Sequence, residues 1–243
     1  MHRPAAFAVC AVAVSALLAG CGSGPQVAAP SSELASQSPL LTAQARATAT
    51  TRNPILFVHG FSSSGTVWNT MISRFKNDGW TSGELFNWSY DTAQSNSVTA
   101  ELIRQKVDGI LAQTGASRVD IISHSMGGLS SRSYLKNLGG DLKVDAWVSL
   151  GGPNHGTNFA NACYTTSCGE MREGSSFLTA LNSTDETPGA VRYATWWSPC
   201  DEIINPDTSV LLSGAVNTQT GCLSHGGLLY SATVYAQVRD FVR

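Results

Sequence analysis

The sequence lacks any block of like charge. Only 13% of the 243 residues are charged, and 15 Lys and Arg stand against 17 Asp and Glu. Domains that bind nucleic acid carry a basic patch or stripe that neutralises phosphates. The sequence has no such stripe, so we expect no nucleic acid as a partner. It also has no internal repeat, which argues against a repeat architecture.

The N-terminus has no apolar run long enough to span a bilayer comfortably. Its apolar stretch, residues 5–19, follows Arg3 and has the character of an export signal. The stretch ends in Leu18-Ala19-Gly20-Cys21, which resembles the lipobox of bacterial lipoprotein precursors. We therefore expect cleavage before Cys21 and lipidation of that residue, which would anchor an exported protein in the cell envelope. A plain secretory signal, giving a secreted protein, is the alternative.

The chain is expected to divide into three parts. Residues 1–20 form the signal peptide. Residues 21–52 are rich in Ser, Ala, Thr, Gln and Pro, have few large apolar side chains, and predict a flexible tether. Residues 53–243 have the length and apolar content of one domain, which we expect to be a monomer.

Cysteine is scarce, but four cysteines remain beyond Cys10 and Cys21. They are Cys163, Cys168, Cys200 and Cys222. An even number outside the cytoplasm indicates two disulfides. Of the three connectivities, we expect Cys163 with Cys168 and Cys200 with Cys222. A four-cysteine zinc site is the alternative, although the spacing is poor for one.

Apolar runs typical of buried strands alternate with amphipathic helical patterns. Strands are expected at 55–58, 85–88, 119–124, 144–150, 191–197 and 215–217, and helices around 68–75, 95–115, 126–138, 177–181 and 230–242. This rhythm indicates βα units. It predicts an α/β fold, with a mainly parallel sheet covered by helices on both faces.

The strand expected at 119–124 leads directly into a serine-centred turn. Ser123-His124-Ser125-Met126-Gly127 matches the G-x-S-x-G nucleophile elbow, except that Ser123 occupies the first glycine position. That position tolerates only a small side chain, so serine is acceptable there. The match predicts Ser125 as a nucleophile. The alternative is an ordinary helix start capped by Ser123 or Ser125.

Catalytic groups in such a sheet lie beyond the carboxyl ends of the strands. Asp201 and His225 follow the last two expected strands and give the serine, acid, histidine order of an α/β-hydrolase. Competing acids are Asp141, Asp145, Asp185 and Asp207. Three other histidines are expected to have other roles. We expect His59 to shape the oxyanion loop, the His124 side chain to point away from Ser125, and His155 to make a structural hydrogen bond. The expected oxyanion donors are the backbone amides of Phe61 and Met126.

Five segments taken together carry a resemblance to a known family. They are Phe57-Val58-His59-Gly60-Phe61, Ser123-His124-Ser125-Met126-Gly127-Gly128, Leu150-Gly151-Gly152-Pro153-Asn154-His155-Gly156-Thr157, Trp197-Ser198-Pro199-Cys200-Asp201 and Ser224-His225. Over residues 53–243 the chain resembles the bacterial class 2 triacylglycerol lipases, relatives of the minimal lidless lipases. The resemblance implies hydrolysis of lipid carboxylic esters without a cofactor. It gives Ser125 as nucleophile, Asp201 as acid and His225 as base.

The resemblance leaves substrate and lid open. Phe61, Trp68, Trp197 and Leu228 are the expected substrate contacts, with Met126, Trp196 and Leu229 as further candidates for an apolar acyl pocket. Residues 158–195 are longer than in the minimal members and could form a small cap. Hydrolysis of polymeric esters, acyl transfer, and a catalytically silent surface-binding domain are the alternative functions. No carboxylate cluster indicates calcium, although Glu202 and Asp207 lie near the acid loop.

Overall fold

The computed structural model describes residues 52–243, and the expected signal peptide, lipobox and tether lie almost wholly outside this range. Six parallel strands form one sheet in the order β2-β1-β3-β4-β5-β6. Their bounds are β1 Ile55–Val58, β2 Leu85–Asn87, β3 Val119–His124, β4 Val144–Leu150, β5 Arg192–Trp197 and β6 Val216–Gln219. The predicted α/β fold is confirmed.

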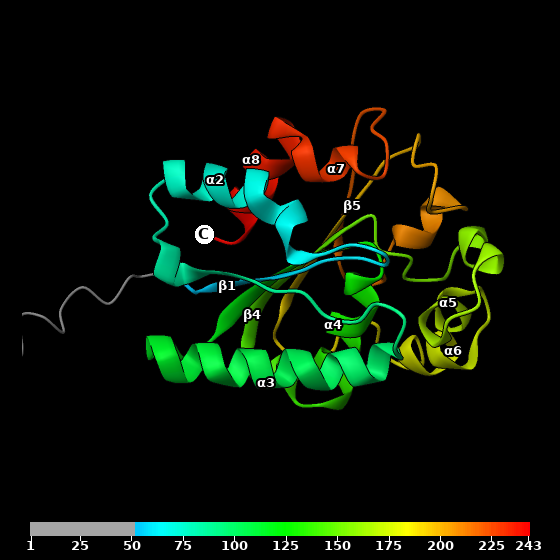
Figure 1. The fold of residues 1–243 in the computed structure, drawn as a ribbon, viewed down its shortest axis with the longest axis horizontal. Coiled ribbons are helices and arrows are strands. Elements are labelled where there is room, and N and C mark those ends of the chain that lie inside the picture. Colours follow the sequence, from blue (N-terminus) through cyan, green and yellow to red (C-terminus); the bar gives the residue numbers. More distant parts are fainter. Residues whose placement is uncertain (1–51) are drawn as a thin grey trace, which may run out of the picture. The chain divides into compact units, whose positions relative to one another are not determined.

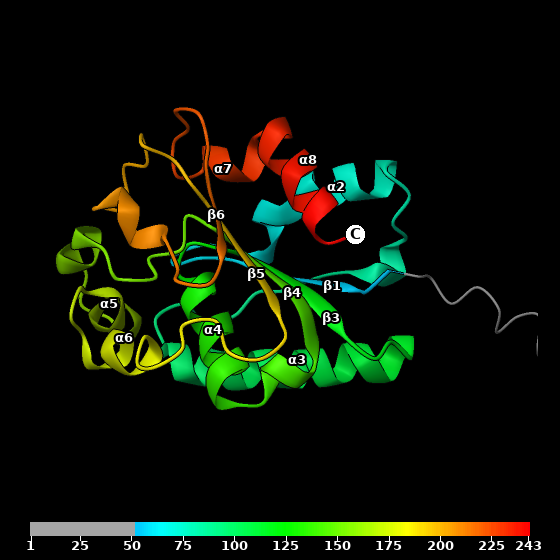
Figure 2. The same ribbon diagram turned by 180° about the vertical axis from the view of Figure 1, so that it is seen from behind.

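Helices cover both faces of this sheet (Figures 1 and 2). The α-helices are α2 Asn69–Asn77, α3 Asn96–Thr114, α4 Gly127–Asn137, α5 Thr166–Met171, α6 Ser176–Leu181, α7 Gly227–Tyr230 and α8 Ala232–Phe241. Short 3-10 turns are η1 Gly65–Trp68, η2 Ser82–Glu84, η3 Gly140–Leu142, η4 Asn158–Ala162 and η5 Asp207–Val210. In the described range, no helix is both long and apolar enough to cross a membrane.

Strand β1 shows why the apolar runs form a doubly covered sheet. Successive side chains of a strand point to opposite faces. Ile55 and Phe57 join the core cluster that includes residues of α2 and α8, whereas Leu56 and Val58 join the cluster of α3 and α4. Both sets are buried, so a continuous apolar run satisfies two cores at once.

Helix α3 has the ends that its sequence predicts. The Ser95 hydroxyl accepts a hydrogen bond from the Ser97 amide, and Gly115 closes the helix with a left-handed φ of 71°. A side-chain cap and a glycine in this conformation satisfy amides and carbonyls that a helix leaves free at its two ends. Helix α3 therefore begins and ends where local chemistry dictates.

The connections place a switch point between β1 and β3. From β1 the chain passes through α2 to β2, and it then returns through α3 to β3 on the other side of β1. In open parallel sheets, the crevice at the carboxyl ends of two such strands is where ligands bind. The loop after β1 and the turn after β3 therefore meet at the position expected of a site.

Candidate active site

Ser125 occupies a strained turn between β3 and α4. Its φ is 55°, a left-handed conformation that a non-glycine residue rarely adopts. The Ser125 amide donates to the Leu150 carbonyl at 2.9 Å, which ties the turn to the end of β4. Within residues 52–243 the Ser125 hydroxyl takes part in no hydrogen bond, and the side chain borders a cavity. Strain of this kind persists where surrounding structure fixes it, as at a nucleophile elbow.

Two glycines permit the close packing around this turn. A Cβ on Gly60 would lie 2.6 Å from the Ser125 Cβ and 3.2 Å from its Oγ. A Cβ on Gly127 would lie 2.5 Å from the His59 carbonyl oxygen. Any larger residue at either position would displace the turn or the loop after β1.

Ser123 fits the first glycine position of the elbow because its hydroxyl has a partner. It is buried, and its Oγ donates to the Val148 carbonyl of β4 at 2.7 Å. A buried hydroxyl without such a bond would be costly. Strand β4 therefore satisfies the hydroxyl that Ser123 adds at the usual glycine position.

Asp201 and His225 come together beyond the ends of β5 and β6. The His225 Nδ1–H donates to Asp201 Oδ2 at 2.8 Å, while Asp201 Oδ1 accepts the amides of Ile203 and Ile204, each at 2.9 Å. Burial acts to raise the pKa of Asp201, but the hydrogen bond and charge of His225 and the two amides outweigh it and lower the pKa. Asp201 is thus a carboxylate at neutral pH. The bond at Nδ1 leaves the His225 Nε2 as the free acceptor.

The loops that carry Asp201 and His225 are joined in three ways. Cys200 and Cys222 form a disulfide, as expected. The Ser198 hydroxyl accepts the amide of Leu223 at 2.9 Å. The carboxylate of Glu202 accepts the backbone amide of His225 at 2.9 Å. These links hold the loop that carries Asp201 against the loop that carries His225.

His124 corrects one expectation, because its side chain does not point away from the site. Its Nε2–H donates to the His225 carbonyl at 3.1 Å, and the two imidazole rings lie 4.5 Å apart. His124 also lines the cavity with Ser125. Burial lowers the pKa of His124 to about 3, with a smaller contribution from His225, so this imidazole is neutral at physiological pH. The reason is strand alternation: Ser123 faces α4, and His124 faces the side where the base loop arrives.

Hydrogen bonds fix the orientation of the Gly60–Phe61 peptide in the loop after β1. The His59 Nδ1–H donates to the Gly60 carbonyl at 2.9 Å, and Tyr90 donates its hydroxyl to the His59 carbonyl. In a trans peptide the C=O and N–H point in opposite directions. Fixing the Gly60 carbonyl on His59 therefore turns the Phe61 N–H away from His59. Among the described residues, neither the Phe61 nor the Met126 amide donates a hydrogen bond, so both remain available as donors.

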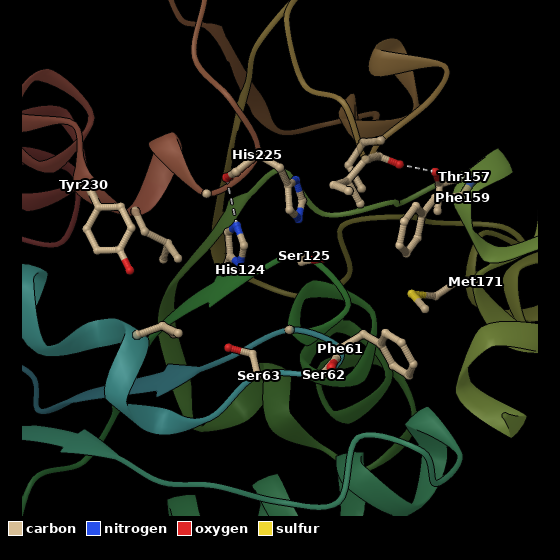
Figure 3. A pocket seen from close by; sticks show the side chains of 16 residues that line it. Phe61, Ser62, Ser63, His124, Ser125, Thr157, Phe159, Met171, His225 and Tyr230 are labelled. Carbon is tan, nitrogen blue, oxygen red and sulfur yellow. Dashed lines mark hydrogen bonds between the residues drawn. The ribbon is translucent and has the colours of Figure 1, made fainter. Parts of the chain in front are cut away.

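A cavity of about 480 Å³ opens over Ser125 (Figure 3). The residues that line it are Gly60, Phe61, Ser62, Ser63, Val67, His124, Ser125, Thr157, Phe159, Met171, Ile203, Ile204, His225, Gly226, Leu229 and Tyr230. Its volume lies within the range of small-molecule sites. Ser125 and His225 share this cavity, and Asp201 lies behind the imidazole.

The cavity corrects the expected set of substrate contacts. Phe61 and Leu229 line it, but the other candidates do not: Trp68, Met126, Trp196, Trp197 and Leu228. Trp68 is fully buried against Phe57, with ring centroids 5.2 Å apart, and Leu228 is fully buried in the core cluster that includes α2 and α8. Trp68 and Leu228 therefore contribute to the protein core and not to the wall of the site.

The cysteine-rich segment, residues 158–195, supplies part of the cavity wall. Cys163 and Cys168 form the expected disulfide. Phe159 and Met171 come from this segment and reach the cavity, which sequence patterns missed. His155 remains outside the cavity, and its Nε2 pairs with Glu186 at 2.8 Å, in keeping with a structural role.

No group of three or more His, Cys, Asp or Glu residues in the range 52–243 is arranged to hold a metal ion. The carboxylate of Asp201 is already occupied by His225 and two amides.

A strained serine after the third strand, with an acid and a histidine on later loops of a parallel sheet, defines an α/β-hydrolase fold. The mature lipase BlEst2 of Bacillus licheniformis shares this fold, with a TM-score of 0.69 at 18% identity over 79% of this chain and 93% of that chain. The family model "Lipase (class 2)" matches residues 52–220. The chain belongs to the class 2 lipase family.

Curated relatives match over part of their length. A triacylglycerol lipase of Pseudomonas fragi is 29% identical over 115 residues, which are 46% of this chain and 38% of the relative. One of Pseudarthrobacter phenanthrenivorans is 30% identical over 122 residues, covering 46% of this chain and 37% of the relative. The chain thus spans less than two fifths of the length of these relatives.

Proposed function

We propose that this chain is a serine hydrolase that cleaves carboxylic esters of lipids. One observation carries the proposal: Ser125 stands in a strained elbow facing a cavity that it shares with His225, whose other ring nitrogen is bonded to buried Asp201. A serine hydroxyl becomes a useful nucleophile when a base takes its proton and a carboxylate orients that base. The bond between His225 and Asp201, and the cavity that His225 shares with Ser125, support these roles.

The reaction proceeds through an acyl-enzyme. His225 Nε2 takes the proton of Ser125 as Oγ bonds to the ester carbonyl carbon, and the carbonyl π electrons move onto its oxygen. The Phe61 and Met126 amides donate to this oxyanion. When the carbonyl re-forms, the bond to the alcohol oxygen breaks, and His225 gives that oxygen its proton. Water, deprotonated by His225, then attacks the acyl-serine; as the bond from the acyl carbon to Oγ breaks, His225 returns the proton to Oγ, which releases the acid and restores Ser125.

Two further observations favour a lipid ester as the substrate. The cavity wall is dominated by apolar side chains, including Phe61, Phe159 and Leu229. The relatives described above are triacylglycerol lipases. Both agree with an acyl group that is buried while its carbonyl carbon meets Ser125.

The proposal includes export and anchoring through Cys21, as the lipobox-like sequence suggests. This part of the chain lies outside the described residues. Metabolic labelling with an alkyne fatty acid tests it: the wild type should be labelled, and Cys21→Ser should not. A wild type without label, recovered from the medium, would favour plain secretion.

Hydrolysis of p-nitrophenyl esters tests the catalytic proposal. Ser125→Ala should lower kcat by about 10⁴-fold or more with the fold intact. Ser117→Ala is the matched control, because Ser117 lies in the loop before β3 and outside the cavity. Activity that persists in Ser125→Ala would overturn the mechanism. An inactive wild type would favour a surface-binding domain, and ester products formed with added alcohols would favour acyl transfer.

A further inference from the structure

The cavity has two apolar walls on opposite sides of Ser125. In Figure 3, Tyr230 lies on one side, and Phe61, Phe159 and Met171 lie on the other. The first wall comes from α7, which begins two residues after His225. The second is built largely from the segment that the Cys163–Cys168 disulfide closes and from the loop after β1. An ester has two substituents on its carbonyl group, so each wall can receive one.

The proposed chemistry assigns the two walls. The leaving alcohol oxygen takes its proton from His225 Nε2, so the alcohol must lie on the His225 side. Helix α7, which carries Leu229 and Tyr230, follows His225 directly in the chain, so we assign its wall to the alcohol. The carbonyl oxygen is directed to the amides of Phe61 and Met126. The acyl chain is then left to the wall opposite Tyr230, which Phe159 and Met171 line.

The acyl side is a fixed wall within the described structure. The Thr157 amide donates to the Met171 carbonyl at 2.9 Å, which closes the segment on itself. Arg172 donates to the carbonyls of Ala160 and Cys163, at 3.2 and 2.9 Å. With the Cys163–Cys168 disulfide, these bonds hold Phe159 and Met171 on one framework.

This framework is also fastened to the main fold. The carboxylate of Glu170 accepts the Ser95 hydroxyl at 2.5 Å and the Asn96 amide at 2.6 Å, at the start of α3. Ser167 donates its hydroxyl to the Thr92 carbonyl at 2.6 Å. Movement of the wall would break these buried or partly buried bonds, each of which stabilises the fold. The segment therefore has the contacts of a static wall and not those of a loose lid.

Charge defines the substrate further. The cavity lining contains no Lys, Arg, Asp or Glu. An ionised headgroup would lose its hydration there without gaining an opposite charge, which is costly. The lining accordingly favours neutral esters over phospholipids or other charged esters.

We propose that Phe159 and Met171 form the acyl-binding wall and set the acyl-chain preference of this site for neutral esters. The inference rests on the proposed function. Phe159 is 43% exposed and lies towards solvent, whereas Met171 is 3% exposed and packs in the cluster that contains Leu129 and Leu178. Phe159 thus covers the acyl chain, and Met171 limits how far the chain reaches towards the core.

The two residues should therefore have opposite effects when shortened. Each methylene of an acyl chain that is buried contributes a factor of about four in binding. Phe159→Ala removes cover from the chain and should lower kcat/KM for octanoate about tenfold relative to acetate. Met171→Ala deepens the pocket and should move the preferred acyl chain to greater length.

The experiment compares kcat/KM for p-nitrophenyl acetate, butyrate, octanoate and laurate. The ratio between two esters cancels the amount of folded enzyme, so a variant of reduced stability still reports on the wall. Met171→Val supplies a second, milder variant. Tyr164→Ala is the control, because Tyr164 lies between Phe159 and Met171 in the chain, inside the Cys163–Cys168 loop, is 92% exposed and does not line the cavity.

Unchanged ratios in Phe159→Ala and in both Met171 variants would overturn the assignment of the wall. If Ser125→Ala is inactive in the same assay, the proposed function survives that result. If Ser125→Ala retains activity, the proposed function fails on its own. Faster hydrolysis of a phospholipid than of a neutral glyceride with the same acyl chain would contradict the neutral-ester preference.

Discussion

Asp120 gives the most quantitative prediction about stability. It is fully buried in β3, where Oδ1 accepts the amide of Ala146 at 3.0 Å and the Asn53 side chain at 3.3 Å, while Oδ2 has no partner among the described residues. Burial raises the pKa of Asp120 from its ordinary value of 3.8 to about 7; the hydrogen bonds from Asn53 and the Ala146 amide and the charge of Arg192 oppose this, while the charge of Asp145 adds to it. The native state therefore binds a proton that the unfolded state has released.

The sign of the pH effect follows directly. Below pH 4 both states hold the proton, and Asp120 imposes no penalty of ionisation. Between about pH 4 and pH 7 the native state holds more protons, so its stability falls as the pH rises. At about 1.4 kcal/mol for each of roughly three pH units, the loss is about 4 kcal/mol at pH 8.

Asp120→Asn removes this loss because an amide does not ionise. Its carbonyl oxygen can still accept the Ala146 amide and the Asn53 side chain. Urea unfolding at pH 4 and pH 8 should show the variant gaining up to about 4 kcal/mol over wild type between the two pH values. Asp91→Asn, at an exposed turn, should change by less than about 0.5 kcal/mol. An Asp120→Asn effect of equal size at both pH values would show that the pKa of Asp120 does not differ between the native and unfolded states.

Three further predictions concern the site. Gly60→Ala should lower kcat for ester hydrolysis by more than about 10²-fold, because the new Cβ would lie 2.6 Å from the Ser125 Cβ. Gly109→Ala in α3 is the control and should keep full activity, because nothing lies within 4 Å of a Cβ at that position. Glu202→Ala should lower kcat about tenfold at unchanged KM, because the His225 backbone amide loses its acceptor. Glu202→Gln keeps an acceptor and should retain most activity. Equal loss in both variants would show that the bond to the His225 amide does not position His225. Replacing Cys200 and Cys222 with serine should lower the free energy of unfolding by about 3 kcal/mol. It should also lower kcat under conditions in which circular dichroism shows that the sheet is intact. Activity and structure lost in parallel would contradict that link.

Local chemistry made much of the fold predictable. The apolar run Ile55–Val58 could only be buried on both faces, and Ser95 and Gly115 mark the ends of α3 by their own conformational preferences. The elbow at Ser125 was predictable for the same reason, because its small neighbours allow the turn. These features depend on a few adjacent residues.

The cavity wall depends on tertiary placement instead. Leu228 and Leu229 are neighbours in a four-residue helix and both belong to the core cluster, yet only Leu229 also lines the cavity. No periodicity can be read over so short a helix. Phe159 and Met171 reach the site because a disulfide and Glu170 fix their segment against α3, which no local pattern records.

The central claim is that Ser125 forms the acyl-enzyme. A p-nitrophenyl phosphonate, which transfers its phosphonyl group to an activated serine, tests this claim most directly when the adduct is located by peptide mass spectrometry. We expect one adduct per chain on Ser125, formed together with complete loss of ester hydrolysis and absent in His225→Ala. An adduct on another residue, or hydrolysis that continues after Ser125 is fully modified, would contradict it.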